Sequence, residues 1–336
     1  MKFDRIANYA RIFYHWRIRK TLAPPYVPED ISIEATNVCN FRCAFCPQSD
    51  PRHHEFAPRT YLEPEKARRI FEVLRRDGVT TRTVHWTLDG EPFMNKQFYG
   101  LCAAAIEHGF TNMHFATNGM LLTDKAVGQL PTGKDVRYTF SIDFAADPAY
   151  FERVRGTPGS WDKVRENIEG ILARDRDDLL VKVTDISTYE TDDREELERR
   201  FDNLKALFPR DSNRLTFARR TFHNAAGLVS KLVNAMPAKS YHLCPYPWPS
   251  LVIASDGNAV ACCRDLRRQT VLGNVLEQGL TAVWSGQPYQ KMRKALVERR
   301  PGDIAACDGC DLPYDNSKFS YANIFRTLAN RLQVFR

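Results

Sequence analysis

Three cysteines near the start of the chain have the spacing of metal ligands. Cys39, Cys43 and Cys46 lie at C-x3-C-x2-C spacing within EATNVCNFRCAFCP, residues 34–47. Thiolates are the usual protein ligands of a [4Fe-4S] cluster, and three of them hold three of its four irons. The fourth iron can then bind a small molecule and pass it an electron. A structural zinc ion would need a fourth ligand, and no fourth cysteine follows locally.

A second set of cysteines lies in the last third of the chain. Cys244 precedes a predicted hairpin, Cys262 and Cys263 end it, and Cys307 and Cys310 follow at C-x2-C spacing. Four thiolates can fill every iron position of a second cluster, which then carries electrons but binds no small molecule. Four thiolates can also hold a structural zinc ion, so the spacing by itself leaves both metals open.

The composition is that of an ordinary globular protein. The 336 residues are 43% hydrophobic and 26% charged, and no apolar run reaches the length of a membrane span. The N-terminus lacks a secretory signal, so we expect a cytoplasmic protein whose nine cysteines are metal ligands or core thiols, as Cys102 is expected to be. The net charge of +7 suits an anionic cofactor or substrate, but it is spread along the chain and does not indicate nucleic-acid binding.

Strands and helices alternate from residue 30 onward. The segment 31–37 predicts a strand that ends at the first cysteine loop. Further strands are predicted at 83–88, 112–117, 136–142, 179–186 and 214–219, with helices between them, for example at 63–77, 96–108 and 161–174. This alternation predicts an α/β fold with a parallel sheet. The first cysteine loop then lies at the C-terminal end of a strand, where α/β barrels place their chemistry.

Both ends of the chain carry basic, partly apolar segments. Residues 1–22 predict a basic amphipathic helix, and prolines end it within a linker that reaches residue 29. Residues 313–336 predict a second amphipathic helix of similar character. We expect both helices to pack on the protein, and contact with a membrane surface is the alternative.

The first cysteine loop resembles that of the radical S-adenosylmethionine (radical SAM) enzymes, which have the same spacing and an aromatic residue before the last cysteine, here Phe45. The resemblance implies a partial (β/α)6 barrel over residues 30–220 and a [4Fe-4S] cluster whose open iron chelates SAM. In that family an electron from the cluster cleaves SAM to methionine and a 5′-deoxyadenosyl radical, which takes a hydrogen atom from the substrate. A flavodoxin- or ferredoxin-type protein is the expected reductant.

The ends of the next strands resemble the SAM contacts of this family. LDGEP resembles a GGEP motif that receives the SAM amino group, although Asp89 replaces its first glycine. ATNG and SID stand where the family contacts SAM and its ribose, and YFERVRG holds an arginine that pairs with the SAM carboxylate. With Phe45, the expected cofactor contacts are Gly90, Glu91, Pro92, Thr117, Asn118, Ser141, Asp143 and Arg155. Asp143 and Arg155 form an ordinary ion pair in the alternative interpretation.

The order of the later cysteines resembles the SPASM/Twitch extension of radical SAM enzymes, together with the DG turn of the hairpin and the GNV segment. Four cysteines match the shorter Twitch form, which holds one auxiliary [4Fe-4S] cluster. We therefore expect a linker at 221–243 and a small auxiliary domain at 244–312. The expected ligands are Cys244, Cys262, Cys307 and Cys310; Cys262 is preferred to Cys263 because the family's ligand is usually the first cysteine after the hairpin.

Two clusters of these kinds together predict an oxidation. Removal of a hydrogen atom from an alcohol carbon, followed by loss of a proton and an electron, gives a ketone, and the auxiliary cluster can receive the electron. The chain resembles Twitch-type alcohol dehydrogenases of aminocyclitol antibiotic pathways, which implies a small polar substrate such as a sugar or aminocyclitol. Arg219, Arg220 and His223, at and just past the last predicted strand, are the candidates to contact the hydroxyl or else to hold the linker.

Three other functions stay open from the sequence. A radical SAM epimerase needs a thiol that returns a hydrogen atom, and Cys263 is the candidate donor. A SPASM maturase would modify a peptide, although residues 1–29 are too few for a peptide-binding domain. An iron-sulfur electron carrier or a zinc-stabilised binding module would not be an enzyme at all.

Overall fold

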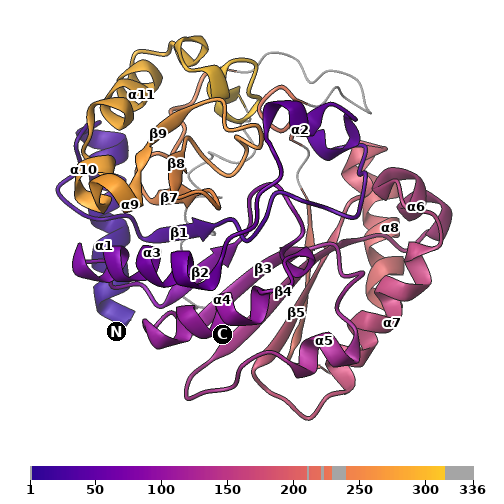
Figure 1. The fold of residues 1–336 in the computed structure, drawn as a ribbon. Coiled ribbons are helices and arrows are strands. Elements are labelled where there is room, and N and C mark those ends of the chain that lie inside the picture. The colour runs from indigo at the N-terminus through magenta and orange to yellow at the C-terminus, as the bar shows by residue number, and fades with distance from the viewer. Residues whose placement is uncertain (1, 210–211, 221–222, 229–239, 315–336) are drawn as a thin grey trace.

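A nine-stranded sheet organises the molecule (Figure 1). The computed structural model describes residues 2–209, 212–220, 223–228 and 240–314. The order of the strands in the sheet is β6-β5-β4-β3-β2-β1-β7-β8-β9. The strands are β1 Asp30–Ile33, β2 Thr83–Trp86, β3 Asn112–Thr117, β4 Arg137–Phe144, β5 Leu179–Asp185, β6 Leu215–Arg219, β7 Ser250–Ile253, β8 Asn258–Val260 and β9 Val271–Asn274.

Strands β1 to β6 run parallel, and helices connect them, as the alternation predicts. The helices are α1 Lys2–Phe13, α2 His53–Phe56, α3 Pro64–Arg76, α4 Phe98–Glu107, α5 Asp124–Gly128, α6 Pro148–Arg155, α7 Ser160–Ala173, α8 Arg194–Ala206, α9 Val275–Gln278, α10 Leu280–Trp284 and α11 Gln287–Val297. The strand predicted at 31–37 ends early, at Ile33, because the chain leaves the sheet there and Thr36 bridges to Tyr61.

Helix α3 illustrates how the helical layer forms. Pro64 lies in its first turn, where the missing backbone N–H removes no helical hydrogen bond. Its buried residues recur every three or four positions, so that one face of the helix packs on the protein interior: Ala67, Ile70, Phe71 and Leu74.

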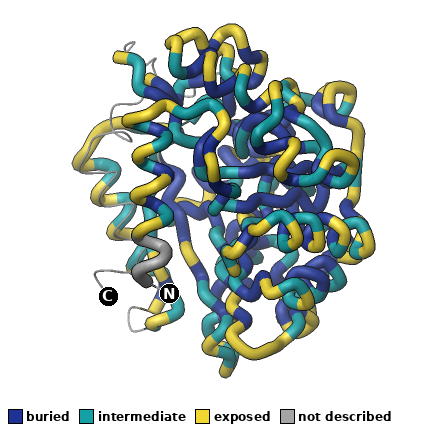
Figure 2. Tube along the Cα trace, turned by 90° about the vertical axis from the view of Figure 1, so that its left-hand side faces the viewer, coloured by how far each residue is buried: buried dark blue, intermediate teal, exposed yellow. Residues whose placement is uncertain are grey.

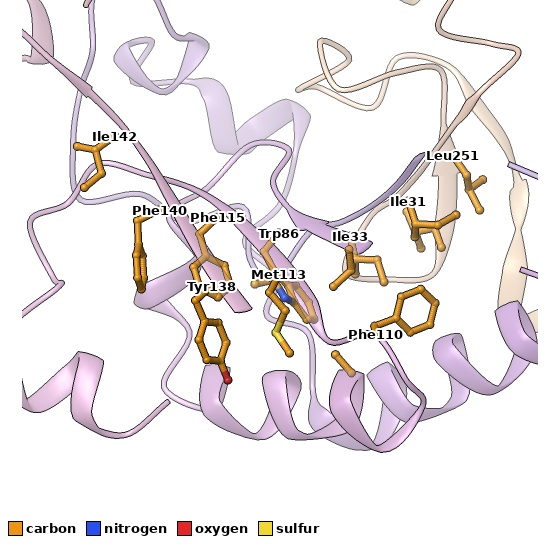
Figure 3. Packing of buried hydrophobic residues seen from close by; sticks show 14 of the residues in the cluster. Ile31, Ile33, Trp86, Phe110, Met113, Phe115, Tyr138, Phe140, Ile142 and Leu251 are labelled. Atoms are coloured by element: carbon orange, nitrogen blue, oxygen red, sulfur yellow. The ribbon is translucent and has the colours of Figure 1, made fainter. Parts of the chain in front are cut away.

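The core lies between the sheet and this helical layer (Figure 3). Phe115 packs on Tyr138 and Phe140, with ring centroids 5.7 and 5.3 Å away. Because side chains alternate along a strand, the residues between these face the other side of the sheet, here called the inner face. Buried residues follow the sheet, while exposed ones lie on the outer turns of helices and in loops (Figure 2).

The C-terminal hairpin continues the barrel sheet. β7 pairs in parallel with β1, from Asp30 opposite Ser250 to Ile33 opposite Ile253. β8 and β9 then extend the sheet in antiparallel order. The predicted hairpin is confirmed as β7 and β8, but its attachment to β1 is not visible in the sequence. A two-stranded ribbon is marginally stable by itself, so β1 supplies the neighbour that this hairpin needs.

A buried arginine joins the C-terminal part to the start of the chain. Arg293 on α11 is fully buried and donates hydrogen bonds to the carbonyl oxygens of Leu22, Pro247 and Trp284 at 2.8–2.9 Å. Its guanidinium also lies 4.4 Å from the ring centroid of Trp284. Burial lowers the pKa of Arg293 to about 10, so the side chain stays charged at neutral pH.

The N-terminal segment packs on the protein. Helix α1 and a π-helical turn, Tyr14–Ile18, form the predicted helix, and Tyr9, Ile12 and Trp16 are buried. No helix among the described residues combines the length and the apolar character that crossing a membrane requires. The predicted C-terminal helix at 313–336 lies outside the described residues from 315 onward.

Replacing Arg293 with methionine is expected to destabilise the protein, because three carbonyl groups, two of them in buried hydrogen bonds, lose their donor. One unsatisfied buried group costs about 1–3 kcal/mol, so the free energy of unfolding should fall by about 3 kcal/mol or more. Anaerobic urea denaturation followed by circular dichroism measures it. The control is Lys294→Met on the same helix, whose side chain is 60% exposed and whose loss should change stability by less than about 0.5 kcal/mol. Equal losses in both variants would contradict the assigned role.

Candidate active site

The first cysteine loop begins where β1 ends. It brings Cys39, Cys43 and Cys46 close enough for their charges to interact. The backbone N–H of Cys46 donates to the carbonyl of Cys43 at 2.9 Å, and the N–H of Phe41 donates to Sγ of Cys39 at 3.4 Å. None of the three forms a disulfide. The structure therefore places the three expected ligands in one turn of backbone.

A glycine lets the end of β2 approach this loop closely. A Cβ atom on Gly90 would lie 2.3 Å from the carbonyl oxygen of Thr36 and 2.7 Å from the backbone of Val38. At this approach the N–H of Glu91 donates to the carbonyl of Val38 at 2.9 Å. The GEP motif therefore holds the loop through its backbone, and only glycine fits at its first position.

A second glycine, at the end of helix α6, lets that helix end approach the cysteine loop closely. Gly156 has φ 63°, and a Cβ atom on it would lie 2.2 Å from the carbonyl oxygen of Arg42. The N–H of Ala44, inside the loop, donates to the carbonyl of Val154 at 2.8 Å. The cysteine loop is thus held from two sides by backbone contacts.

Burial raises the pKa of these thiols, and negative neighbours raise it further. The pKa of Cys39 is raised to about 12, first by burial and then by the carboxylate of Glu91. The pKa of Cys46 is raised well above its ordinary value by burial and by Cys43. Buried thiolates that repel one another need positive charge between them, which a metal cluster supplies. This donor set fits an iron-sulfur cluster.

Glu91 joins the ends of β2 and β3 to the cysteine loop. Its carboxylate accepts hydrogen bonds from the hydroxyl of Thr117 at 2.8 Å and from the backbone N–H of Asn118 at 2.7 Å. The side-chain amide of Asn118 donates to Oδ1 of Asn40 at 2.7 Å and lies 3.8 Å from Sγ of Cys39. Three expected cofactor contacts therefore form one network beside the first thiol.

Asp89, which replaces a glycine of the GGEP motif, has buried partners of its own. Its Oδ2 lies 2.7 Å from Nε2 of His53, and its Oδ1 accepts a hydrogen bond from Gln48 at 3.1 Å. Gln48 also donates to the carbonyl of Asn37 at 2.8 Å. The departure from the motif thus adds a link between the cysteine loop and helix α2.

Asp143, near the end of β4, lies between two arginines. Nη2 of Arg220 donates to its Oδ1 at 2.5 Å, and Nη1 of Arg155 lies 3.6 Å from its Oδ2. The ion pair considered as the alternative for Asp143 and Arg155 is therefore present. Arg155 is buried over the ring of Phe45, and its Nε has no hydrogen-bond partner among the described residues. A buried guanidinium with an unused N–H fits a carboxylate ligand.

The two arginines at the end of β6 point in opposite directions. Arg220 turns to Asp143, and its Nη1 lies 3.5 Å from Nε2 of His223. Arg219 instead donates from Nη1 to Oε1 of Glu198 on helix α8 at 3.0 Å. Neighbouring residues of an extended chain face opposite sides, and this corrects the expectation for Arg219, which lies away from the candidate substrate contacts.

Two more expected contacts lie at the same edge of the sheet, with one residue that the sequence analysis missed. Pro92 begins a short 3-10 turn directly after Glu91, and Ser141 lies two residues before Asp143 on β4. Phe45 stacks on Tyr189, with ring centroids 4.2 Å apart and an 11° angle between the rings. A single tyrosine after a strand has no spacing that marks it in the sequence.

The second set of cysteines comes together beside the hairpin. Burial and mutual repulsion raise the pKa of the thiols of Cys244, Cys262 and Cys307, to about 12 for Cys307. Cys310 interacts with each of them. The backbone N–H of Arg264 donates to Sγ of Cys262 at 3.4 Å, and its Nη1 lies 4.0 Å from Sγ of Cys310. The structure therefore brings the four expected ligands together, and the buried Arg264 lies beside three of them, Cys244, Cys262 and Cys310.

A cluster and a single zinc ion place their thiolates differently. Within the described part of the chain, no three His, Cys, Asp or Glu side chains are grouped as ligands of one metal ion. A zinc ion draws its four thiolates to about 2.3 Å from one point. In a cluster each thiolate binds a different iron, so the sulfur atoms stand further apart.

Sequence comparisons agree with this arrangement. The model of the Radical SAM superfamily matches residues 33–201, and that of the SPASM iron-sulfur cluster-binding domain matches residues 244–311. The chain is 22% identical over 284 residues to the S-adenosyl-L-methionine-dependent 2-deoxy-scyllo-inosamine dehydrogenase of Niallia circulans. This alignment covers 84% of this chain and 92% of that protein. The chain is 28% identical over 144 residues to the GTP 3′,8-cyclase of Pectobacterium atrosepticum, covering 43% of this chain and 41% of the cyclase.

Two solved structures resemble the chain in fold. BtrN in complex with AdoMet and 2-DOIA has a TM-score of 0.54 at 18% identity, covering 85% of this chain and 94% of BtrN. Native anSMEcpe with bound AdoMet has a TM-score of 0.58 at 13% identity. That match covers 90% of this chain and 100% of anSMEcpe. The expected fold class is confirmed.

Replacing Gly156 with alanine is expected to displace the cysteine loop. Its matched control is Gly159→Ala, because Gly159 also has a left-handed conformation, φ 72°, but nothing lies within 4 Å of its Cβ position. Both variants carry about 1–2 kcal/mol of backbone strain, and only the first adds the collision with Arg42. Iron analysis of anaerobically reconstituted protein should fall from about eight atoms per chain toward about four in Gly156→Ala alone. Equal iron in the two variants would show that the close approach is dispensable.

Proposed function

The chain belongs to the radical SAM superfamily, and from this premise we propose that it oxidises an alcohol carbon of a small polyhydroxylated molecule, such as a sugar or aminocyclitol, to a ketone. Its C-terminal part is a SPASM-type auxiliary cluster domain. When bound, SAM and the cluster at Cys39, Cys43 and Cys46 supply the 5′-deoxyadenosyl radical that removes the hydrogen atom, and the auxiliary cluster supplies the electron acceptor.

A shared apolar cluster between the two sets of thiols carries this proposal. Cys46 of the first set and Cys263, next to the expected ligand Cys262, both pack against the same group of buried residues: Leu88, Ala225, Val252, Ala254, Val260 and Leu266. An alcohol that has lost a hydrogen atom must still lose a proton and an electron to become a ketone. The end of the hairpin that carries Cys263 and the expected ligand Cys262 therefore packs on the same apolar residues as the first loop, where an electron acceptor is needed.

Glu91 and Arg155 are the proposed holders of SAM. Both interact electrostatically with Cys39, so they flank the first cysteine loop with opposite charges. This pair suits the ammonium and the carboxylate of the methionine part of SAM, since a carboxylate accepts from an ammonium and a guanidinium donates to a carboxylate. Asn118, bonded to Glu91, fixes the distance between the cofactor contacts and the loop.

The proton of the alcohol needs an acceptor, and His223 is our candidate. Its Nε2 lies 3.5 Å from Arg220, which is anchored by Asp143. An imidazole can accept a proton near neutral pH. The arginine keeps its charge and can stabilise the oxygen as the carbonyl forms. One hydrogen atom, one proton and one electron then leave the alcohol, which balances the oxidation.

The relative with the longest alignment favours a small substrate. The Niallia circulans protein is named as a 2-deoxy-scyllo-inosamine dehydrogenase and aligns over most of both chains. Epimerisation gains no support from the site, because Cys263 is hydrogen-bonded to Tyr246 and packed in the apolar cluster. We expect a flavodoxin- or ferredoxin-type protein to deliver the electron that starts each turnover.

Alanine at Cys39, Cys43 or Cys46 is expected to abolish SAM cleavage, because the remaining thiolates cannot hold the cluster. The measurement is 5′-deoxyadenosine formed under dithionite in anaerobic protein. Cys102→Ala is the matched control, since Cys102 is a fully buried thiol of helix α4 outside both sets. Full cleavage in a loop variant would contradict the assignment.

Replacing both Cys307 and Cys310 with alanine is expected to leave SAM cleavage intact and to stop oxidation of the alcohol. The first cluster is intact in this variant, so 5′-deoxyadenosine should still form. Ketone formation from a panel of sugars and cyclitols should stop, because the electron acceptor is missing. Unchanged ketone formation would show that the auxiliary cluster takes no part in the oxidation.

A further inference from the structure

Asn167 is a polar residue on the buried face of helix α7. Its neighbours on that face are apolar and fully buried: Val164, Ile168 and Ile171. The helical periodicity of this face favours another apolar side chain at position 167. Asn167 is only 5% exposed, and a buried amide is costly unless it forms hydrogen bonds. Its place in this face therefore depends on specific partners.

The partners of Asn167 are two carbonyl groups of the turn that follows β3. Nδ2 of Asn167 donates to the carbonyl oxygen of Gly119 at 2.8 Å and to that of Met120 at 3.1 Å. An amide nitrogen carries two donors, so one side chain can hold both carbonyls. Asn167 thus fixes the orientation of two successive peptide groups in this turn.

Gly119 brings the same turn against helix α7. Its φ is 81°, and a Cβ atom on it would lie 2.9 Å from Cγ1 of Val164 on α7 and 3.2 Å from Cγ2 of Ile142 on β4. Glycine is needed here because the backbone is left-handed and the space beside it is filled. The turn is therefore held to α7 by packing as well as by the hydrogen bonds of Asn167.

This turn orients Asn118, which is one of the expected SAM contacts. The carbonyl of Gly119 and the N–H of Met120 belong to one planar peptide group, and they point in opposite directions. Asn167 holds the carbonyl, while the N–H donates to Oδ1 of Asn118 at 2.9 Å. The amide of Asn118 in turn donates to Asn40 in the first cysteine loop at 2.7 Å. A single peptide group therefore connects Asn167 to the cofactor contacts.

Helices α6 and α7 hold two sides of the candidate active site. The end of α6 contacts the cysteine loop through Gly156 and through the carbonyl of Val154, and α7 holds the turn after β3. The two helices pack together (Figure 1), and Glu152 of α6 accepts a hydrogen bond from the backbone N–H of Trp161 at 3.2 Å. One helix pair therefore sets the position of the turn relative to the loop.

We propose that Asn167 is a positioning residue for SAM, because it fixes the peptide group that orients Asn118 beside the first cysteine loop. The inference rests on the proposed function, in which Glu91 and its partner Asn118 are placed at the SAM site. A contact that is already in position needs no reordering when the ligand binds, so it adds to affinity. Asn167 then raises the affinity for SAM through the backbone of the turn.

The test is a titration of SAM into the reduced, anaerobic holoenzyme, followed by the change that SAM causes in the EPR spectrum of the first cluster. Asn167→Leu keeps a side chain of similar size and removes both donors. We expect the half-saturating SAM concentration to rise about tenfold, at the low end of the cost of losing a supporting contact. Iron should stay at about eight atoms per chain. The rate of SAM cleavage at saturating SAM should change far less, because the lost contact serves binding.

Ile168→Val is the matched control, since it removes buried volume from the same face of α7 and no hydrogen bond. It should leave the half-saturating SAM concentration unchanged. Asn167→Ser, which is smaller, gives a second comparison that is free of added apolar bulk. An unchanged SAM titration in the Asn167 variants would overturn the inference. Loss of iron in both of them would also overturn it, because the role of Asn167 would then be structural only.

Failure of the inference and failure of the proposed function give different results. If the native protein responds to SAM and the Asn167 variants respond equally, only the inference is wrong. If the native protein shows no response to SAM, the proposed function is wrong and the inference falls with it.

Discussion

The pairing of β1 on both of its sides is the constraint on which the rest of the structure depends. β2 pairs with one edge of this four-residue strand and β7 with the other. Neighbouring strands in a sheet lie about 4.8 Å apart. The first cysteine loop leaves the end of β1, and the hairpin that leads to Cys262 starts from β7. The distance between the two sets of thiols is therefore set by backbone hydrogen bonds, which side-chain changes alter little.

Both sets of thiols use the same electrostatic arrangement. Arg155 lies beside the first set and interacts with Asp143, while Arg264 lies beside the second and is bound by Asp311 at 2.6 Å. A buried ion is costly unless a partner compensates it. In each case one carboxylate holds an arginine in place, and the arginine turns its remaining positive charge toward sulfur. This arrangement suits cofactors that bring several thiolates out of water.

Local patterns in the sequence predicted much of the fold and the members of both thiol sets. Strands such as β3 and helices such as α3 have strong apolar periodicity, which reports directly on their burial. The attachment of β7 to β1 was not predictable, because both are short apolar runs that fit many partners. Tyr189 was missed for a related reason: its importance comes from Phe45, a neighbour supplied by a distant loop. The opposite directions of Arg219 and Arg220 could not be predicted either, because they depend on where β6 ends and how it pairs with β5, and the sequence does not specify this.

The sheet order has a consequence for how the protein matures. Asp30 and Ser250 are paired although 220 positions separate them along the chain. During synthesis β1 emerges early, but its second neighbour leaves the ribosome only after most of the protein has been made. Contacts between such distant segments form slowly, since a long loop must close first. The second set of thiols therefore reaches its place beside β1 only when the chain is nearly complete, and assembly of the auxiliary cluster belongs to the completed chain.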